Sequence, residues 1–160
     1  MFNPKYRILI MSDCFPQDTV ICLGTQLISI VNSIKGLLPE HIWYGADVDA
    51  FGKGVRNYNL ESFQLTMIGT DRQFIEYCSG VEQFIWGVFL GIRCVVDPQT
   101  IQGIELGTED EPFRPIDCDG ILLEIRTFDT TYFEISSEDL DLIKKISELY
   151  DVEIEEIKSS

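Results

Sequence analysis

The alternation of apolar and polar residues is clearest over Gly120–Tyr150, where it predicts a β-hairpin followed by an amphipathic helix. Large apolar side chains occupy every second position on both sides of a short turn, which is the period of a half-buried strand. These alternating residues are Ile121, Leu123, Ile125, Phe133 and Ile135. We therefore expect the rest of the fold to be built around this unit.

The register of the hairpin follows from its turn, Asp129-Thr130-Thr131. A three-residue loop places Arg126 opposite Glu134 and Ile125 opposite Ile135, so that like faces meet. A two-residue loop would mix the two faces along the whole pair. We expect the three-residue loop.

The helix after the hairpin is predicted to begin near Ser136 or Ser137. Their hydroxyls can accept hydrogen bonds from the free backbone N–H groups of a first turn. Glu138 and Asp139 then lie in that turn, where the helix dipole favours negative charge. One apolar stripe along the helix must cover the sheet. The stripe consists of Leu140, Ile143, Ile146 and Tyr150.

Three further strands are predicted near residues 6–11, 42–49 and 84–92. The last of them lies in Phe84–Val96, the most hydrophobic stretch of the chain, and its composition is typical of a central strand covered on both faces. Gly87 and Gly91 indicate a bulge there, or the close approach of a large side chain.

A second long helix is predicted near residues 18–35, where Asp18 can cap apolar residues at three- and four-residue spacing. A short helix follows later in the chain, capped by Thr70 or Asp71 and ended by Gly80. Weaker strand patterns occur at Phe63–Ile68 and near residues 152–157.

Together these elements predict an α+β fold in a single domain, residues 1–160: a mostly antiparallel sheet of about five strands with two main helices packed on one face. Residues 99–119 contain six acids and few large apolar side chains. We interpret them as an acidic loop or irregular excursion that is either functional or partly strand. Residues 158–160 are predicted to form a frayed tail.

The charge is unevenly distributed. The chain has 12 Lys and Arg against 27 Asp and Glu, a formal net charge of −15, and residues 101–160 hold five bases and seventeen acids, or −12 of that total. Such a field repels nucleic acid and anionic lipid and attracts basic partners. Increased solubility is the other reading of the same charge.

The cysteines predict a reducing compartment. They are five in number, scattered, and without a C-x-x-C pair, which is typical of free thiols in a cytoplasmic protein. We expect no secretory signal before the first strand and no membrane span, because no apolar run is long enough. The cysteines are Cys14, Cys22, Cys78, Cys94 and Cys118.

Candidate metal ligands are sparse. The single histidine, His41, has no cysteine near it in sequence, so a zinc site of the usual spacing is not expected. Asp117–Gly120 is similar to the start of a calcium loop but lacks the later oxygen ligands, and we interpret it as a turn. Asp47 and Asp49 fall on one strand face and could hold a divalent metal; the alternative is a charged, solvent-facing strand edge.

No nucleophile or cofactor motif is evident. There is no G-x-S-x-G sequence, Walker motif or dinucleotide fingerprint, and we predict no cofactor. Cys14 follows a strand end, as catalytic thiols do, but no phosphate-binding loop surrounds it.

In size, charge and sheet-plus-helix layout the chain resembles the small, acidic, single-domain immunity proteins that neutralise bacterial toxins. The stretches that carry this resemblance are Gln83–Phe89 and Asp129–Ile135. The resemblance implies a protein that binds a basic toxin such as a nuclease. No family motif is matched, so it assigns no functional residues.

We therefore predict a non-enzymatic cytoplasmic binding protein that presents an acidic surface to a basic protein partner. Alternatives are a metal-dependent hydrolase or transferase that uses Asp47 and Asp49, and a structural domain. The sequence leaves the oligomeric state open. The predicted partner-binding residues are Glu105, Glu109, Asp110, Glu111, Asp117, Asp119, Glu138, Asp141 and Glu148.

Overall fold

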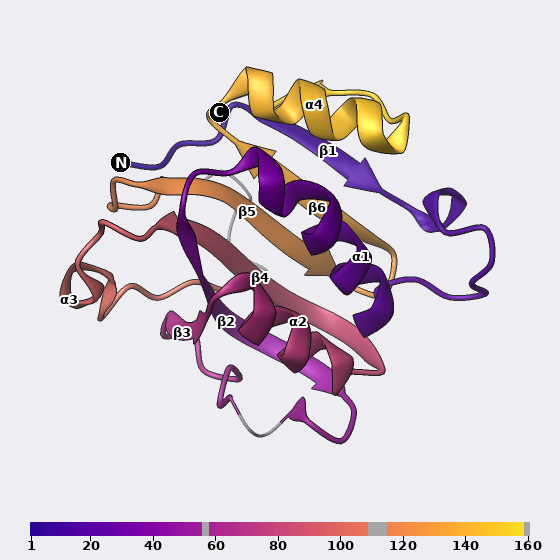
Figure 1. Ribbon diagram of the computed structural model, residues 1–160, viewed down its shortest axis with the longest axis horizontal. Coiled ribbons are helices and arrows are strands. Elements are labelled where there is room, and N and C mark those ends of the chain that lie inside the picture. Colours follow the sequence, from indigo (N-terminus) through magenta and orange to yellow (C-terminus); the bar gives the residue numbers. More distant parts are fainter. Residues whose placement is uncertain (56–57, 109–114, 159–160) are drawn as a thin grey trace.

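One antiparallel sheet runs through the computed structural model, which describes residues 1–55, 58–108 and 115–158 (Figure 1). Its seven strands lie in the order β3-β2-β4-β5-β6-β1-β7. They are β1 (Tyr6–Ile10), β2 (His41–Phe51), β3 (Thr66–Gly69), β4 (Gln83–Arg93), β5 (Ile121–Phe128), β6 (Tyr132–Ser137) and β7 (Glu155–Glu156). The helices of the described residues are α1 (Gly24–Ile34), α2 (Asp71–Ser79), α3 (Pro98–Ile101) and α4 (Leu140–Tyr150), with 3-10 turns at Ser12–Cys14 and Lys35–Leu37.

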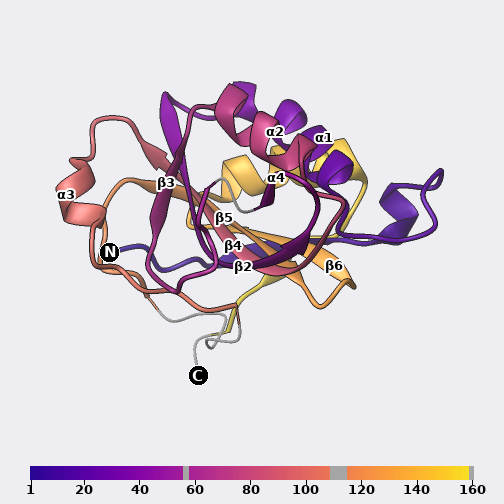
Figure 2. The ribbon, with the colours of Figure 1, turned by 90° about the horizontal axis from the view of Figure 1, so that it is seen from below.

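The α+β class and the antiparallel sheet are confirmed, but the sheet has seven strands where five were predicted. The two additional strands are β3 and β7, which come from the weaker patterns at 63–68 and 152–157 and close the two edges of the sheet. Three helices, α1, α2 and α4, lie on the same face, where two were expected (Figure 2). We call this the helix face, and the opposite side the second face.

The helix face is packed almost entirely with apolar and aromatic side chains. Phe74 of α2 contacts Trp43 and Phe89, with ring centroids 4.8 and 5.1 Å apart, and Phe84 meets Phe89 edge-on at 5.6 Å. From α4, Ile143 and Ile146 are fully buried in the same cluster. Alternate residues of the strands face this core, as the period of two requires.

The hairpin has the predicted register. Arg126 pairs with Glu134 and Ile125 with Ile135, around the three-residue loop. Asp129 and Thr130 adopt left-handed backbone angles, with φ of 49° and 53°, and Thr131 donates its amide to the Phe128 carbonyl at 2.9 Å.

The predicted start of α4 was wrong. Ser136 and Ser137 are the last residues of β6, and Asp139 caps the helix by accepting the amides of Asp141 and Leu142. Ser137 supports this cap indirectly, because its hydroxyl accepts a hydrogen bond from the backbone N–H of Asp139 at 3.1 Å. The helix therefore begins two or three residues later than expected.

The predicted start of α1 was also wrong. The helix begins at Gly24 rather than near residue 18, because Cys22 has a φ of 67° and its carbonyl accepts the Phe84 amide of β4 at 2.7 Å. Gly24 lies so close to the backbone near Val81 that an added Cβ would lie 2.2 Å from the Val81 carbonyl oxygen. Asp18 instead accepts a hydrogen bond from the Gln26 side chain.

The short helix α2 follows the sequence prediction. The Thr70 hydroxyl accepts the Gln73 amide and Gly80 follows the last turn.

The second face has its own apolar cluster, which residues 98–108 and 115–119 help to cover. This segment pairs with its neighbours through single bridges: Leu65 donates to the Ile104 carbonyl, Leu106 to that of Phe63, and Phe2 pairs with Ile116. The cluster consists of Phe2, Tyr44, Ala46, Leu65, Val88, Leu90, Ile92, Ile101, Leu106, Ile116, Cys118 and Ile121. The central strand β4 is thus covered on both faces, as its composition predicted.

Glycine 91 allows β4 to pack tightly on the helix face. A Cβ there would lie 2.9 Å from Leu123 Cδ2 and 3.4 Å from the Trp43 ring, and the register with β5 shifts at the same place.

In the described chain, no helix combines the length and the apolar character that crossing a bilayer requires.

Candidate functional site

Six of the nine predicted partner-binding residues can be placed, and all six are exposed: Glu105, Asp117, Asp119, Glu138, Asp141 and Glu148. The other three, Glu109, Asp110 and Glu111, lie outside the described residues.

Three of the six come together at the beginning of the chain. The Met1 ammonium donates to an Asp119 carboxylate oxygen, and the Asn3 amide donates to Glu138 Oε1 at 3.1 Å. The hydrogen bond from Met1 lowers the pKa of Asp119, while the pKa of the ammonium is raised by that bond and by the charges of Asp119, Asp117 and Glu138. These carboxylates therefore share one local field.

The other three are separated from this group. Glu105 bridges to Gln64, close to β3 at the far edge of the sheet. Asp141 and Glu148 lie on α4, which also exposes Lys144 and Lys145. The predicted set is thus spread over several parts of the surface.

Additional exposed acids lie beyond α4 and were not predicted as binding residues. They follow the helix into β7, which pairs with β1, so that the helix and this last segment occupy one side of the molecule (Figure 1). We call this side the acidic edge, defined by Asp141, Glu148, Asp151, Glu153, Glu155 and Glu156. The alternation of Glu153 and Glu155 with Val152 and Ile154 was the sequence signal for it.

Buried charge on the second face was missed by the sequence interpretation. Glu124 and Arg126 of β5 are both buried, and the Arg126 Nε donates to Glu124 Oε1. The same guanidinium reaches the Thr108 carbonyl at 3.0 Å. Arg126 thereby ties the irregular segment to the sheet.

A second charged group lies beside it. Glu134 is buried opposite Arg126 and accepts a hydrogen bond from Arg7 at 3.1 Å, and Arg7 also donates to Glu155 at 2.7 Å. Burial raises the pKa of Glu134, and the charge of Arg7 opposes that rise. The second carboxylate oxygen of Glu134 has no hydrogen-bond partner among the described residues.

Asp47 has a structural partner. It adopts a φ of 51° at a bulge in β2, and its carboxylate accepts the Thr108 amide at 2.7 Å. Asp49 pairs with Trp86 of β4. The Nε2 atom of His41 lies 2.6 Å from Asp71 Oδ1, and the same carboxylate oxygen accepts a hydrogen bond from the Trp43 indole N–H. The described residues contain no group of three His, Cys, Asp or Glu side chains that could hold a metal ion.

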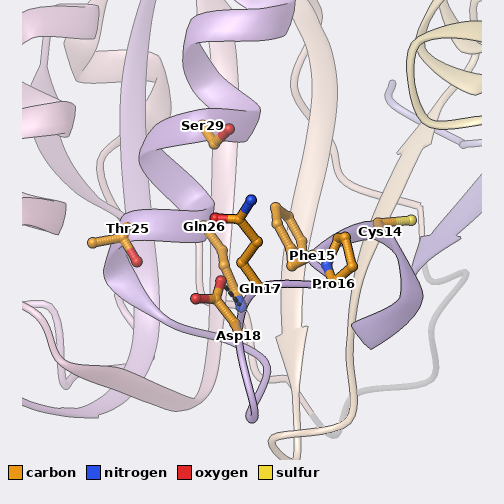
Figure 3. Close-up of a pocket in the computed structure, with 8 residues that line it drawn as sticks. All are labelled: Cys14, Phe15, Pro16, Gln17, Asp18, Thr25, Gln26 and Ser29. Atoms are coloured by element: carbon orange, nitrogen blue, oxygen red, sulfur yellow. Dashed lines mark hydrogen bonds between the residues drawn. The ribbon is translucent and has the colours of Figure 1, made fainter.

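Most of the thiols are at least partly shielded from solvent. Cys22, Cys78 and Cys118 are buried and Cys94 is exposed; burial raises the pKa of Cys22 to about 11, which disfavours the reactive thiolate. Cys14 borders an open cavity of about 400 Å³ beside the start of α1. Figure 3 shows its sulfur pointing away from the other lining side chains, and burial raises the pKa of this thiol too.

Comparison with known proteins assigns no family. No protein-family model matches the chain, and no curated protein or solved structure is significantly similar to it. The functional inference therefore rests on the residues themselves.

Proposed function

We propose that this chain is a non-enzymatic cytoplasmic binding protein that presents an acidic surface to a basic protein partner, as a toxin-neutralising immunity protein does. One observation carries the proposal: in the described part of residues 101–160, twelve acids are exposed against three lysines. The lysines are Lys144, Lys145 and Lys158.

Part of the positive charge of residues 101–160 is buried inside the molecule. Arg126, the one arginine in the described part of residues 101–160, is buried against Glu124, so it cannot offset the outer acids at the surface. Glu134 is the other acid buried there. Folding thus buries two acids and one base of this described region, and its surface keeps twelve acids against three lysines.

A surface of one sign acts at a distance. It steers an oppositely charged protein toward it and raises the association rate, and salt screens this effect beyond about 10 Å at 0.1 M. It also disfavours nucleic acid, which needs positive charge.

The alternative of a metal-dependent enzyme has no specific support. It requires Asp47 to bind a metal, whereas that carboxylate holds the Thr108 amide. The tie gives Asp47 a structural role.

The test is association kinetics with the protein that co-purifies from the host. We expect the on-rate to fall as salt rises from 50 to 300 mM, and to fall at low salt when Asp141, Glu148 and Glu153 are changed to amides. A matched control changes three exposed acids outside residues 101–160, namely Glu61, Glu76 and Asp97. An on-rate that ignores salt, or an acidic partner, contradicts the proposal.

A further inference from the structure

Three aromatic side chains form a row across the second face. Trp86 of β4 pairs with Phe128 of β5, which pairs with Tyr132 of β6. The rings of Phe128 and Tyr132 are stacked, with centroids 5.4 Å apart and an interplanar angle of 11°. Trp86 is 36% exposed and Phe128 38%. Their neighbours on the second face are largely buried under the irregular segment. The row is therefore accessible to a ligand.

A small cavity of about 150 Å³ opens beside this row, and the described residues that line it are Trp86, Thr108, Phe128 and Asp129. Thr108 is only 3% exposed, and its hydroxyl oxygen has no hydrogen-bond partner among the described residues. A buried hydroxyl without a partner costs free energy. A ligand that hydrogen-bonds to it would recover that cost.

The lining selects the chemistry of the ligand. Aromatic faces attract cations, and tryptophan is the most effective of them. The carboxylate of Asp129 accepts hydrogen bonds, and the hydroxyl of Thr108 can accept one. A guanidinium is planar, carries five N–H donors and has no acceptor, so it can stack on a ring and satisfy both oxygens.

We propose that this cavity receives an arginine side chain of the basic protein partner. This inference rests on the proposed function and names the anchor of that interaction. The guanidinium stacks on the exposed rings of Trp86 and Phe128 and donates to Asp129 and Thr108. Fully enclosed aromatic and arginine contacts are the usual sources of affinity in an interface.

The row also leads to the acidic edge. Tyr132, at its end, is close enough to Glu155 for that charge to act on its hydroxyl: burial raises the pKa of Tyr132, and the charges of Glu134 and Glu155 raise it further against Arg7. Glu155 belongs to the acidic edge. A basic segment anchored at Trp86 can thus continue onto the acids beyond β1.

The two tryptophans provide the test. We follow their indole N–H signals by two-dimensional NMR of the ¹⁵N-labelled chain during titration with an octa-arginine peptide. We expect the Trp86 signal to shift saturably, while the signal of Trp43, which is buried and bonded to Asp71, stays in place. An octa-lysine peptide should bind more weakly, because its ammonium groups do not stack as a planar fork.

Variants separate the cavity from the general charge. Trp86→Ala and Thr108→Val should each weaken octa-arginine binding, Trp86→Ala by about fivefold or more. Phe63→Ala removes an exposed aromatic that does not line the cavity and should leave binding unchanged. The melting temperature of each variant checks that it is folded.

The remaining outcomes are distinct. If octa-arginine binds Trp86→Ala as tightly as the parent but loses affinity when Asp141, Glu148 and Glu153 become amides, the cavity inference is wrong and the proposed function stands. If neither set of changes affects binding, both are wrong. A Trp86 shift with the neutral sugar maltohexaose and none with the peptide would identify a carbohydrate site instead.

Discussion

The two faces of the sheet are stabilised by different kinds of interaction. On the helix face, α1, α2 and α4 cover large apolar and aromatic side chains, whereas the buried charged residues Glu124, Arg126 and Glu134 lie on the second face. On the second face, an irregular segment covers a smaller cluster and is joined to the sheet by Arg126 and Asp47 through backbone groups of Thr108.

We expect this difference to separate stability from recognition. Regular helices bury a continuous stripe and leave little of the sheet accessible. An irregular covering segment satisfies its own backbone with a few polar contacts, and its residue Thr108 lies beside the exposed aromatics Trp86 and Phe128. We expect the helix face to control folding and the second face to control binding.

The largest expected effect is on the helix face. Phe133→Ala should reduce the free energy of unfolding by about 3–5 kcal/mol and Ile143→Ala by about 2–5 kcal/mol, because both side chains are fully buried. Urea denaturation measures both. A loss below about 0.5 kcal/mol for either, the size of a surface effect, would show that this face is not the stability core.

On the second face the charged pair gives a sharper test. Arg126→Met leaves Glu124 buried without its partner and should cost about 3 kcal/mol. Adding Glu124→Leu removes the stranded charge, so the double variant should regain most of that loss. If the single and double variants lose the same free energy of unfolding, the ion pair is not what stabilises this position. Apolar packing would then contribute more to stability here, as it does on the helix face.

The smallest effect should come from pH. Because the pKa of Glu134 is raised in the fold, the native state holds its proton to higher pH than the unfolded chain does. Stability from this group is therefore present below the unfolded value near 4.5 and is lost as pH rises through the folded value.

Glu134→Gln should remove this dependence. Urea denaturation of parent and variant at several pH values above 4.5 should show the parent losing stability relative to the variant as pH rises. A difference that is constant with pH would show that Arg7 compensates the burial of Glu134 completely.

The sequence was sufficient for the α+β class and for the register of the hairpin, because alternation is a local signal. The register of Ile125 with Ile135 follows from turn length and side-chain faces alone. The late start of α1 was not accessible in this way, since Cys22 is held by Phe84, far along the chain.

The second face could not be predicted for the same reason. In a β-strand pattern, Glu124, Arg126 and Glu134 look like solvent-facing positions. They are buried in the fold, and Arg126 is tied there to a segment that no periodicity marks as a covering layer. The partial exposure of Trp86, which lies beside Thr108 of this segment, could not be predicted from the sequence either.

The position of β1 has a consequence for how the chain is made. This first strand lies between β6 and β7, and its residue Ile10 pairs with Phe133. During synthesis, which proceeds from the N-terminus, β1 emerges long before either neighbour exists. It cannot take its place in the sheet until residues Tyr132–Ser137 of β6 have been made, so this part of the sheet forms in a late, non-local step of the kind that slows folding.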